Sequence, residues 1–218
     1  MELFDKKLAS EIASLLLEIK AIQLQPEKPF TWASGWKSPI YCDNRISLSF
    51  PEVRTFIKKS LVKAIQANFP EVQSIAGVAT AGIPQGALIA DQMELPFLYV
   101  RSKPKGHGME NMIEGKVTPG QKVVVVEDLV STGGSSLKAV KDLKAAGFEV
   151  LGMVSIFTYG FDIATLNFQN AGVKLICLSD YSSMLPQALG DDYIDDLTLA
   201  SLVEWRKDPS AWKGVRAR

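Results

Sequence analysis

The residues best suited to chemistry in this sequence are two adjacent acids, Glu127 and Asp128, at the end of an apolar run. Small hydroxylated residues and glycines follow, so that the stretch reads VVVVEDLVSTGGSS. The glycines let the backbone turn tightly and approach a ligand closely. A helix expected to start here directs its free N–H groups and the positive end of its dipole at the same point. Hydroxyl groups come from Ser131, Thr132, Ser135 and Ser136. Together these features predict a binding site for a phosphate monoester.

The two acids distinguish this segment from other phosphate-binding motifs. It lacks the GxxxxGK[ST] pattern of a P-loop, with its lysine, and the GxGxxG pattern of a dinucleotide-binding turn. Carboxylates beside a phosphate site can accept hydrogen bonds from the vicinal hydroxyls of a ribose, and they can stabilise positive charge at its anomeric carbon. An ordinary strand–turn–helix with solvated acids is the alternative, but the full run of features favours a sugar phosphate.

The same segment resembles the phosphoribosyl-pyrophosphate signature of the type I phosphoribosyltransferases. The resemblance implies that Glu127 and Asp128, the acid pair, face the ribose hydroxyls, with Asp128 as a catalytic residue. It also implies that the next residues wrap the 5′-phosphate. We call these residues the phosphate cradle: Ser131, Thr132, Gly133, Gly134 and Ser135. The implied substrate is phosphoribosyl pyrophosphate (PRPP), with Mg²⁺ as a cofactor bound mainly by substrate oxygens and not by a cage of protein ligands.

A second chemical segment, residues 101–111, reads RSKPKGHGMEN and follows a predicted strand. Its basic residues are Arg101, Lys103, Lys105 and His107, the one histidine of the chain. Such a loop can neutralise a leaving pyrophosphate, and a histidine with an ordinary pKa near ~6.5 can supply a proton or a hydrogen bond. A solvated basic hairpin is the alternative.

This segment, the lid loop, resembles the mobile catalytic loop of orotate phosphoribosyltransferases. The resemblance implies that Lys105 and His107 are catalytic and that all four basic residues bind PRPP. It also implies a homodimer in which each lid loop acts in the partner's active site. Ser102 departs from members that have a lysine at this position.

The loop ATAGIP, residues 79–84, is similar to the pyrophosphate loop of the family, whose backbone N–H groups hold the leaving group. Ala81 stands where many members have a lysine, so this loop is not expected to carry charge. A plain turn between a strand and a helix is the alternative.

The segment FTWASGWKSPIYCDNR, residues 30–45, resembles the N-terminal hood of orotate phosphoribosyltransferases. The resemblance implies that the base is orotate, a flat ring with a carboxylate. Tyr41 is then expected to stack on the base, and Ser131 to meet it. Trp32 and Trp36 are expected to pack within the hood.

The partner of the orotate carboxylate is less obvious from the sequence. Ala33 replaces a lysine that many members have, and the strand end SIFTYG lacks the arginine that some members have. Arg45 is the first candidate because its fork matches a carboxylate, and Lys37 is the second. Surface charge is the alternative for both.

The elements that must position these residues follow an alternating pattern. Residues 74–80, 96–102, 122–128, 149–157 and 173–180 are predicted strands, with helices predicted at 83–93, 135–147 and 162–170 between them. The alternation and the apolar strands predict an α/β fold: a central, mostly parallel sheet flanked by helices. A helix is predicted at 5–22, and another starts near Pro51 after the candidate cap Ser49. We expect one domain over residues 1–218, with an N-terminal helix and hood at 1–48, a core at 49–190 and a helical tail at 191–218.

Composition excludes several other classes of protein. The chain of 218 residues has 24 basic and 24 acidic residues, so nothing indicates bulk binding to nucleic acid. No apolar run is long enough for a membrane helix, and the N-terminus lacks the layout of a signal peptide. Its two cysteines predict reduced thiols, and we expect a cytoplasmic protein. The alternative functions are phosphoribosyl transfer to a purine or uracil, and a regulator that senses PRPP without turnover.

Overall fold

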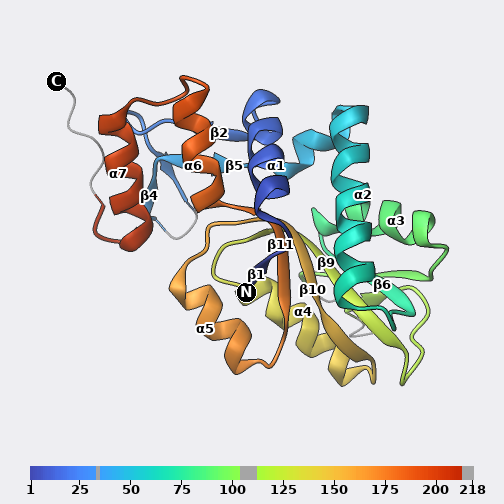
Figure 1. Cartoon of the computed structure of the whole chain (residues 1–218). Coiled ribbons are helices and arrows are strands. Elements are labelled where there is room, and N and C mark those ends of the chain that lie inside the picture. Colours follow the sequence, from blue (N-terminus) through green and yellow to red (C-terminus); the bar gives the residue numbers. More distant parts are fainter. Residues whose placement is uncertain (33–34, 104–111, 213–218) are drawn as a thin grey trace.

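The computed structural model describes residues 1–32, 35–103 and 112–212. A seven-stranded sheet forms its centre, in the order β1-β11-β10-β9-β6-β7-β8 (Figure 1). All neighbouring strands are parallel except β7 and β8. The strands are β1 (Glu2–Leu3), β6 (Ser74–Val78), β7 (Phe97–Val100), β8 (Ile113–Glu114), β9 (Lys122–Val130), β10 (Glu149–Thr158) and β11 (Leu175–Asp180). The predicted α/β fold is confirmed.

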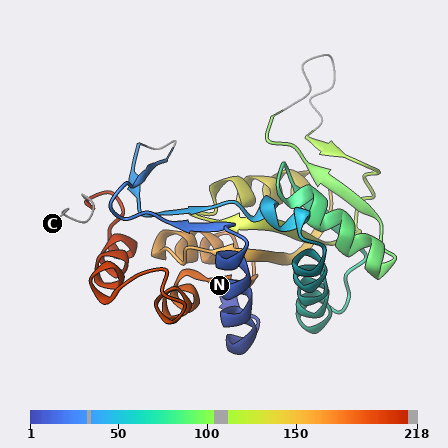
Figure 2. The same ribbon diagram turned by 90° about the horizontal axis from the view of Figure 1, so that it is seen from above.

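Helices cover both faces of this sheet, as the apolar strands require. Alternate residues of β9 point to opposite faces, so Val124 and Val126 join one buried cluster while Val123 and Val125 join the other. The helices are α1 (Lys6–Glu18), α2 (Pro51–Asn68), α3 (Gly82–Met93), α4 (Gly134–Ala145), α5 (Asp162–Asn170), α6 (Tyr181–Gly190) and α7 (Asp196–Lys207). Figure 2 shows the sheet between yellow α4 on one side and blue α1 and teal α2 on the other.

The order of the strands creates a switch point between β6 and β9. From β6 the chain proceeds outward through α3 to β7, whereas β9 is followed by β10 and β11 on the other side. In open α/β sheets, ligands bind beyond the carboxyl ends of the strands at such a point. The acid pair lies at the end of β9, and the loop at 79–84 leaves the end of β6. The fold therefore brings both segments to the expected binding edge.

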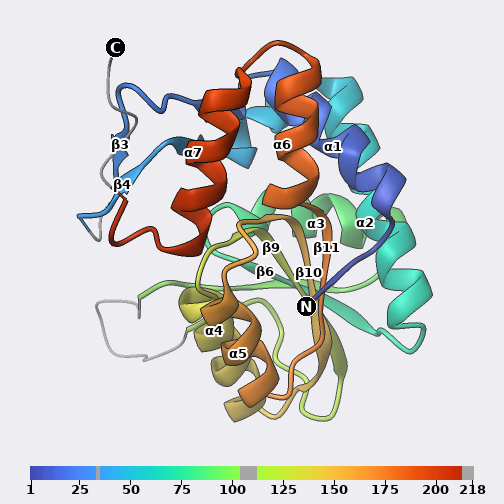
Figure 3. The ribbon, with the colours of Figure 1, turned by 60° about the vertical axis from the view of Figure 1, so that its left-hand side comes forward.

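The hood consists of short paired strands above this edge. Antiparallel pairs form between β2 (Ile22–Leu24) and β5 (Ile40–Cys42), and between β3 (Phe30–Thr31) and β4 (Lys37–Ser38). A 3-10 helix, η1 (Asn44–Ser49), leads from the hood into α2. Helices α6 and α7 lie on the same side of the sheet as α1 (Figure 3). Trp205 of α7 is fully buried and packs against Trp32 of the hood, with ring centroids 5.6 Å apart.

Three local predictions are wrong. The N-terminal helix ends at Glu18, not near residue 22, because Lys20 takes a left-handed conformation with φ of 58° and the chain then enters β2. Ser49 belongs to η1 and does not cap α2, which begins at Pro51 without a side-chain cap. Strand β8 lies within residues 103–115, which the sequence indicates as a loop rich in glycine and lysine. No helix of the described ranges has the length and apolar character needed to cross a membrane.

Candidate active site

Glu127 is a buried carboxylate at the centre of the candidate site. Its side chain is 5% exposed. Oε1 accepts a hydrogen bond from the backbone N–H of Asp128 at 3.0 Å, and Oε2 accepts one from the hydroxyl of Ser136 at 3.0 Å. Burial, and then the neighbouring charge of Asp128, raise the pKa of Glu127 well above its ordinary value. Ser136 was expected to offer its hydroxyl to the phosphate, but it holds Glu127 instead.

Asp128 is the more accessible member of the acid pair. It is half-buried, and burial raises the pKa of its carboxyl, while hydrogen bonds and the positive charge of Arg45 act in the opposite direction. Asn44 of η1 is buried, and its side-chain amide donates a hydrogen bond to the backbone carbonyl of Asp128 at 2.8 Å. This bond fixes the hood to the end of β9, next to the acid pair.

The phosphate cradle forms the turn between β9 and α4, as the sequence predicts. Gly133 has a φ of +81°, a conformation that favours glycine, and it precedes the first residue of α4. No side chain caps α4, so the N–H groups of its first turn remain available for a ligand. Asn167 of α5 donates a hydrogen bond to the carbonyl of Thr132 at 3.0 Å. An anion can therefore be bound by the uncapped end of this helix.

The start of α3 approaches the acid pair closely. A side-chain carbon at Gly82 would overlap the carbonyl oxygen of Val126, the residue before Glu127. Helix α3 has no side-chain cap either. In its first turn Ile83 donates to the carbonyl of Thr80 at 3.3 Å and Pro84 has no N–H, so Gly82 is the residue that can offer its N–H at the switch point. This geometry suits the backbone-mediated anion binding predicted for the loop at 79–84, which has no lysine.

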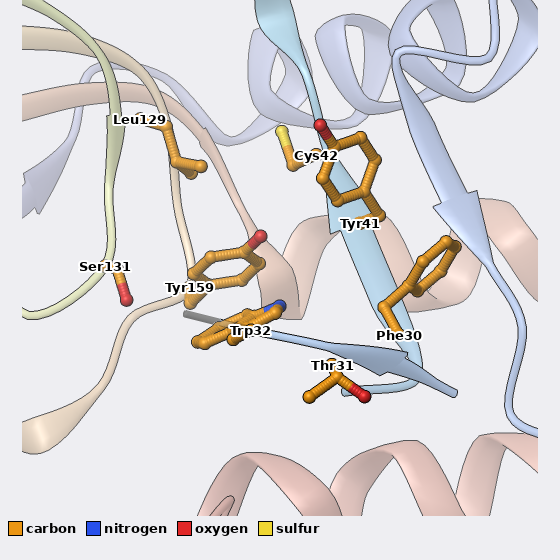
Figure 4. Close-up of a pocket in the computed structure, with 8 residues that line it drawn as sticks. All are labelled: Phe30, Thr31, Trp32, Tyr41, Cys42, Leu129, Ser131 and Tyr159. Atoms are coloured by element: carbon orange, nitrogen blue, oxygen red, sulfur yellow. The ribbon is translucent and has the colours of Figure 1, made fainter. Parts of the chain in front are cut away.

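An aromatic cavity of about 410 Å³ lies beside the acid pair, beneath the hood (Figure 4). We call it the base cavity. Its lining comes from β3, β5, the end of β9 and the end of β10: Phe30, Thr31, Trp32, Tyr41, Cys42, Leu129, Ser131 and Tyr159. The rings of Trp32 and Tyr159 are 5.2 Å apart, and those of Phe30 and Tyr41 are 5.4 Å apart. None of the lining residues is charged, so the cavity suits a flat ring whose charge is bound at its rim.

Two lining residues go beyond the predictions. Trp32 packs within the hood as expected, but it also lines the base cavity. Tyr159 was missed altogether. It is 3% exposed, and burial is the main cause that raises its pKa well above the ordinary value of tyrosine. The available signal was its place at the end of a predicted strand, where some relatives have an arginine. Trp36, by contrast, is 36% exposed.

The two cations proposed for the carboxylate lie at different places. Arg45 of η1 forms a two-pronged ion pair with Asp43, in which Nε and Nη2 lie 2.7 Å and 2.8 Å from the two carboxylate oxygens. Lys37 donates to the hydroxyl of Thr31 at 2.8 Å across the β3–β4 pair. Successive side chains of a strand alternate, so Lys37 and Thr31 share the face opposite to that of Phe30. Thr31 also lines the base cavity, so Lys37 is bound to one residue of the lining without belonging to the lining itself.

The start of the lid loop lies at the sheet edge near the cradle. Arg101 forms an ion pair with Glu114 of β8, with Nη1 and Oε1 3.0 Å apart. Arg101 and Ser135 of the cradle line one small cavity of about 80 Å³. Lys103 is exposed. Lys105 and His107 lie outside the described residues.

The fold and this arrangement define a class of sugar-phosphate enzymes, and comparison with known proteins agrees. The model of the phosphoribosyl transferase domain matches residues 47–174. The orotate phosphoribosyltransferase of Cytophaga hutchinsonii is 61% identical over 203 residues, which are 93% of this chain and 97% of the relative. The chain belongs to the type I phosphoribosyltransferases, and within them to the orotate phosphoribosyltransferase family.

Solved structures support the same family. The orotate phosphoribosyltransferase from Aeropyrum pernix matches 81% of this chain and 97% of its own, with a TM-score of 0.73 and 28% identity. The UMP synthase of Leishmania donovani matches 91% of this chain with a TM-score of 0.77 and 26% identity. This chain covers 42% of that longer protein.

Proposed function

We propose that this protein transfers the 5-phosphoribosyl group from PRPP to N1 of orotate, which yields orotidine 5′-monophosphate and pyrophosphate. One observation carries the proposal: the short segment after the acid pair serves two sites at once. Leu129 and Ser131 line the base cavity, and Ser131 also begins the phosphate cradle. A ribose with its phosphate in the cradle and its hydroxyls at the acid pair would therefore direct C1 toward a base in the cavity.

The two acids of the pair differ in accessibility, and we assign them different roles. Asp128, the more exposed acid, accepts hydrogen bonds from the ribose hydroxyls and stabilises the positive charge that grows on the ribose as the bond to pyrophosphate breaks. Glu127 is fixed by Ser136 and the backbone, so its carboxyl group is held at a preset position. Cradle residues 131–135 hold the 5′-phosphate through hydroxyl and backbone N–H groups.

The leaving pyrophosphate is neutralised by the lid loop. Arg101 and Lys103 bind its phosphates, Lys105 balances the charge that develops on the leaving oxygen, and His107 supplies a proton or hydrogen bond. We propose a homodimer in which these residues act in the partner's active site. The resemblance of residues 101–111 to the mobile catalytic loop of the family supports this arrangement.

Orotate occupies the base cavity, where Tyr41 stacks on the ring and Ser131 meets its edge. Arg45 binds the carboxylate, since its positive charge already acts on Asp128 at the rim of the site. The alternative, Lys37, is bound to the hydroxyl of Thr31 and is the second candidate. A neutral base would lack this ionic contact, and therefore the proposal favours orotate over uracil.

Mg²⁺ is the proposed cofactor. Among the described residues no cluster of three or more histidine, cysteine or acidic side chains could hold a metal ion. This donor set suits an ion that takes most of its ligands from the pyrophosphate, the ribose hydroxyls and water, while the acid pair orients those hydroxyls. When bound, the ion supplies neutralisation of phosphate charge. We also propose a cytoplasmic location, which the free, buried Cys42 and Cys177 support.

A panel of bases tests the reaction directly. Release of pyrophosphate from PRPP is measured with magnesium and with orotate, uracil, hypoxanthine or xanthine. Turnover with orotate alone is the expected result. Turnover with a purine or uracil but not with orotate would overturn the base assignment, and binding of PRPP without turnover of any base would overturn the catalytic assignment.

A further inference from the structure

The ion pair of Asp43 and Arg45 occupies only one edge of the guanidinium group. Asp43 accepts hydrogen bonds from Nε and Nη2, which form one edge of the guanidinium. A guanidinium carries five N–H donors, so Nη1 and the second hydrogen of Nη2 still form a complete two-pronged edge. Arg45 can therefore bind a second carboxylate without leaving Asp43.

Asp43 is itself held firmly. Its backbone N–H donates to the carbonyl of Ala21 at 2.8 Å, and its carboxylate also accepts from the backbone N–H of Arg45 at 3.1 Å, at the start of η1. The hydrogen bond from the Arg45 side chain is the main cause that lowers the pKa of Asp43. The carboxylate thus stays ionised and fixes one edge of the arginine near the hood.

Arg45 belongs to the segment that borders the proposed site of the reaction. Asp43 is followed by Asn44, which is bonded to the carbonyl of Asp128, and preceded by Cys42 of the base cavity. After Asp43, the negative charge of Asp128 also raises the pKa of Arg45. Arg45 is an exposed cation three residues after Cys42, which lines a cavity without charged lining residues.

We propose that Asp43 is a positioning residue for substrate specificity: it fixes the Nε–Nη2 edge of Arg45 so that the remaining edge receives the carboxylate of the pyrimidine substrate. This inference rests on the proposed function, since it assigns a partner to the orotate carboxylate. Asp43 acts through Arg45 and makes no contact with the base. Because no residue of the cavity lining is charged, Asp43 provides the positioning of the cation that the cavity wall itself does not provide.

The test compares Asp43→Asn, Asp43→Ser, Arg45→Ala and the double variant Asp43→Asn with Arg45→Ala. Asn and Ser both keep an acceptor for the start of η1, and neither can pair with the arginine fork. Each single Asp43 variant is expected to raise KM for orotate about tenfold, since loss of one charged hydrogen-bond partner costs about one power of ten. KM for PRPP, kcat at saturating orotate and the melting temperature are expected to stay close to their wild-type values.

Two further readouts separate positioning from structural support. The double variant should show no higher KM for orotate than Arg45→Ala alone, because Asp43 acts only through the arginine. The neutral methyl ester of orotate, used as a competitive inhibitor, should bind wild type and Asp43→Asn equally well.

Several outcomes would overturn the inference. A lower KM for orotate in the Asp43 variants would show that Asp43 competes with the substrate. An unchanged KM, or equal rises for orotate and PRPP with a lower melting temperature, would leave Asp43 with a structural role. Failure of the proposed function itself is distinguishable, because wild type would then not turn over orotate.

Discussion

Gly133, the last residue of the turn before α4, is a position where a single methyl group should be damaging. Its φ of +81° is a conformation that costs an alanine about 1–2 kcal/mol. The added carbon would also lie 2.7 Å from Cε2 of Phe168, whereas carbon atoms pack best at about 3.5–4.0 Å. Phe168 is buried, so its ring can move only by disturbing α5, at a cost of about 1–3 kcal/mol. Gly133→Ala is therefore expected to lower the free energy of unfolding by about 2–5 kcal/mol.

The neighbouring glycine supplies a matched control. Gly134 has an ordinary φ, and an added carbon there would lie 3.9 Å from Oγ1 of Thr132, within ordinary van der Waals contact. Gly134→Ala should leave stability unchanged or raise it by up to about 1 kcal/mol, since alanine reduces the freedom of the unfolded chain. Thermal unfolding separates the two: Gly133→Ala is expected to lower the melting temperature by roughly 5–15 °C.

A double-mutant cycle with Phe168→Leu identifies the cause. Removing the aromatic ring should recover the steric part of the Gly133→Ala cost and leave the conformational part, so a coupling energy of about 1–2 kcal/mol is expected. Equal melting temperatures for the two alanine variants, or additive effects of Gly133→Ala and Phe168→Leu, would refute this account of the cradle.

Three other predictions follow from the site. Asp128→Asn should lower kcat about a hundredfold or more with a normal melting temperature, while Asp91→Asn on the exposed side of α3 should change neither; normal kcat in Asp128→Asn would remove it from catalysis. Burial raises the folded pKa of Glu127, so its charged form opposes folding and stability is lost as pH rises through the interval between the unfolded and folded pKa values. Glu127→Gln should therefore have a higher free energy of unfolding than wild type at pH 8, by about 1 kcal/mol or more. This gain should shrink toward pH 4, and a different trend would contradict the burial of the charge. If the lid loop acts in the partner's site, refolding equal amounts of Asp128→Asn with the double variant Lys105→Ala and His107→Ala should restore about a quarter of wild-type activity, and no recovery in proven mixed dimers would show that the lid acts within its own subunit.

The phosphate half of the site was predictable because it is local in sequence. Its parts follow one another without interruption: the apolar run of β9, the acid pair, the cradle and α4. Each part can be identified from its amino-acid composition. The end of the N-terminal helix was not predictable, since the apolar periodicity continues to Ile22. Ile22 is buried for another reason. The chain leaves the helix at Lys20, which has a left-handed conformation, and Ile22 pairs with Cys42 in a small sheet.

The base half of the site depends instead on segments that are far apart in the chain. Trp32 and Tyr159 meet across the cavity only because Trp205, near the other end of the sequence, packs on both, with ring centroids 5.6 Å and 5.9 Å away. The indole N–H of Trp205 also donates to the backbone carbonyl of Lys37 at 3.1 Å, which ties α7 to the β3–β4 hairpin. No short motif records such a contact. The geometry of the proposed phosphate cradle is therefore determined by one turn of chain, whereas that of the base cavity depends on how the hood, β10 and α7 pack together.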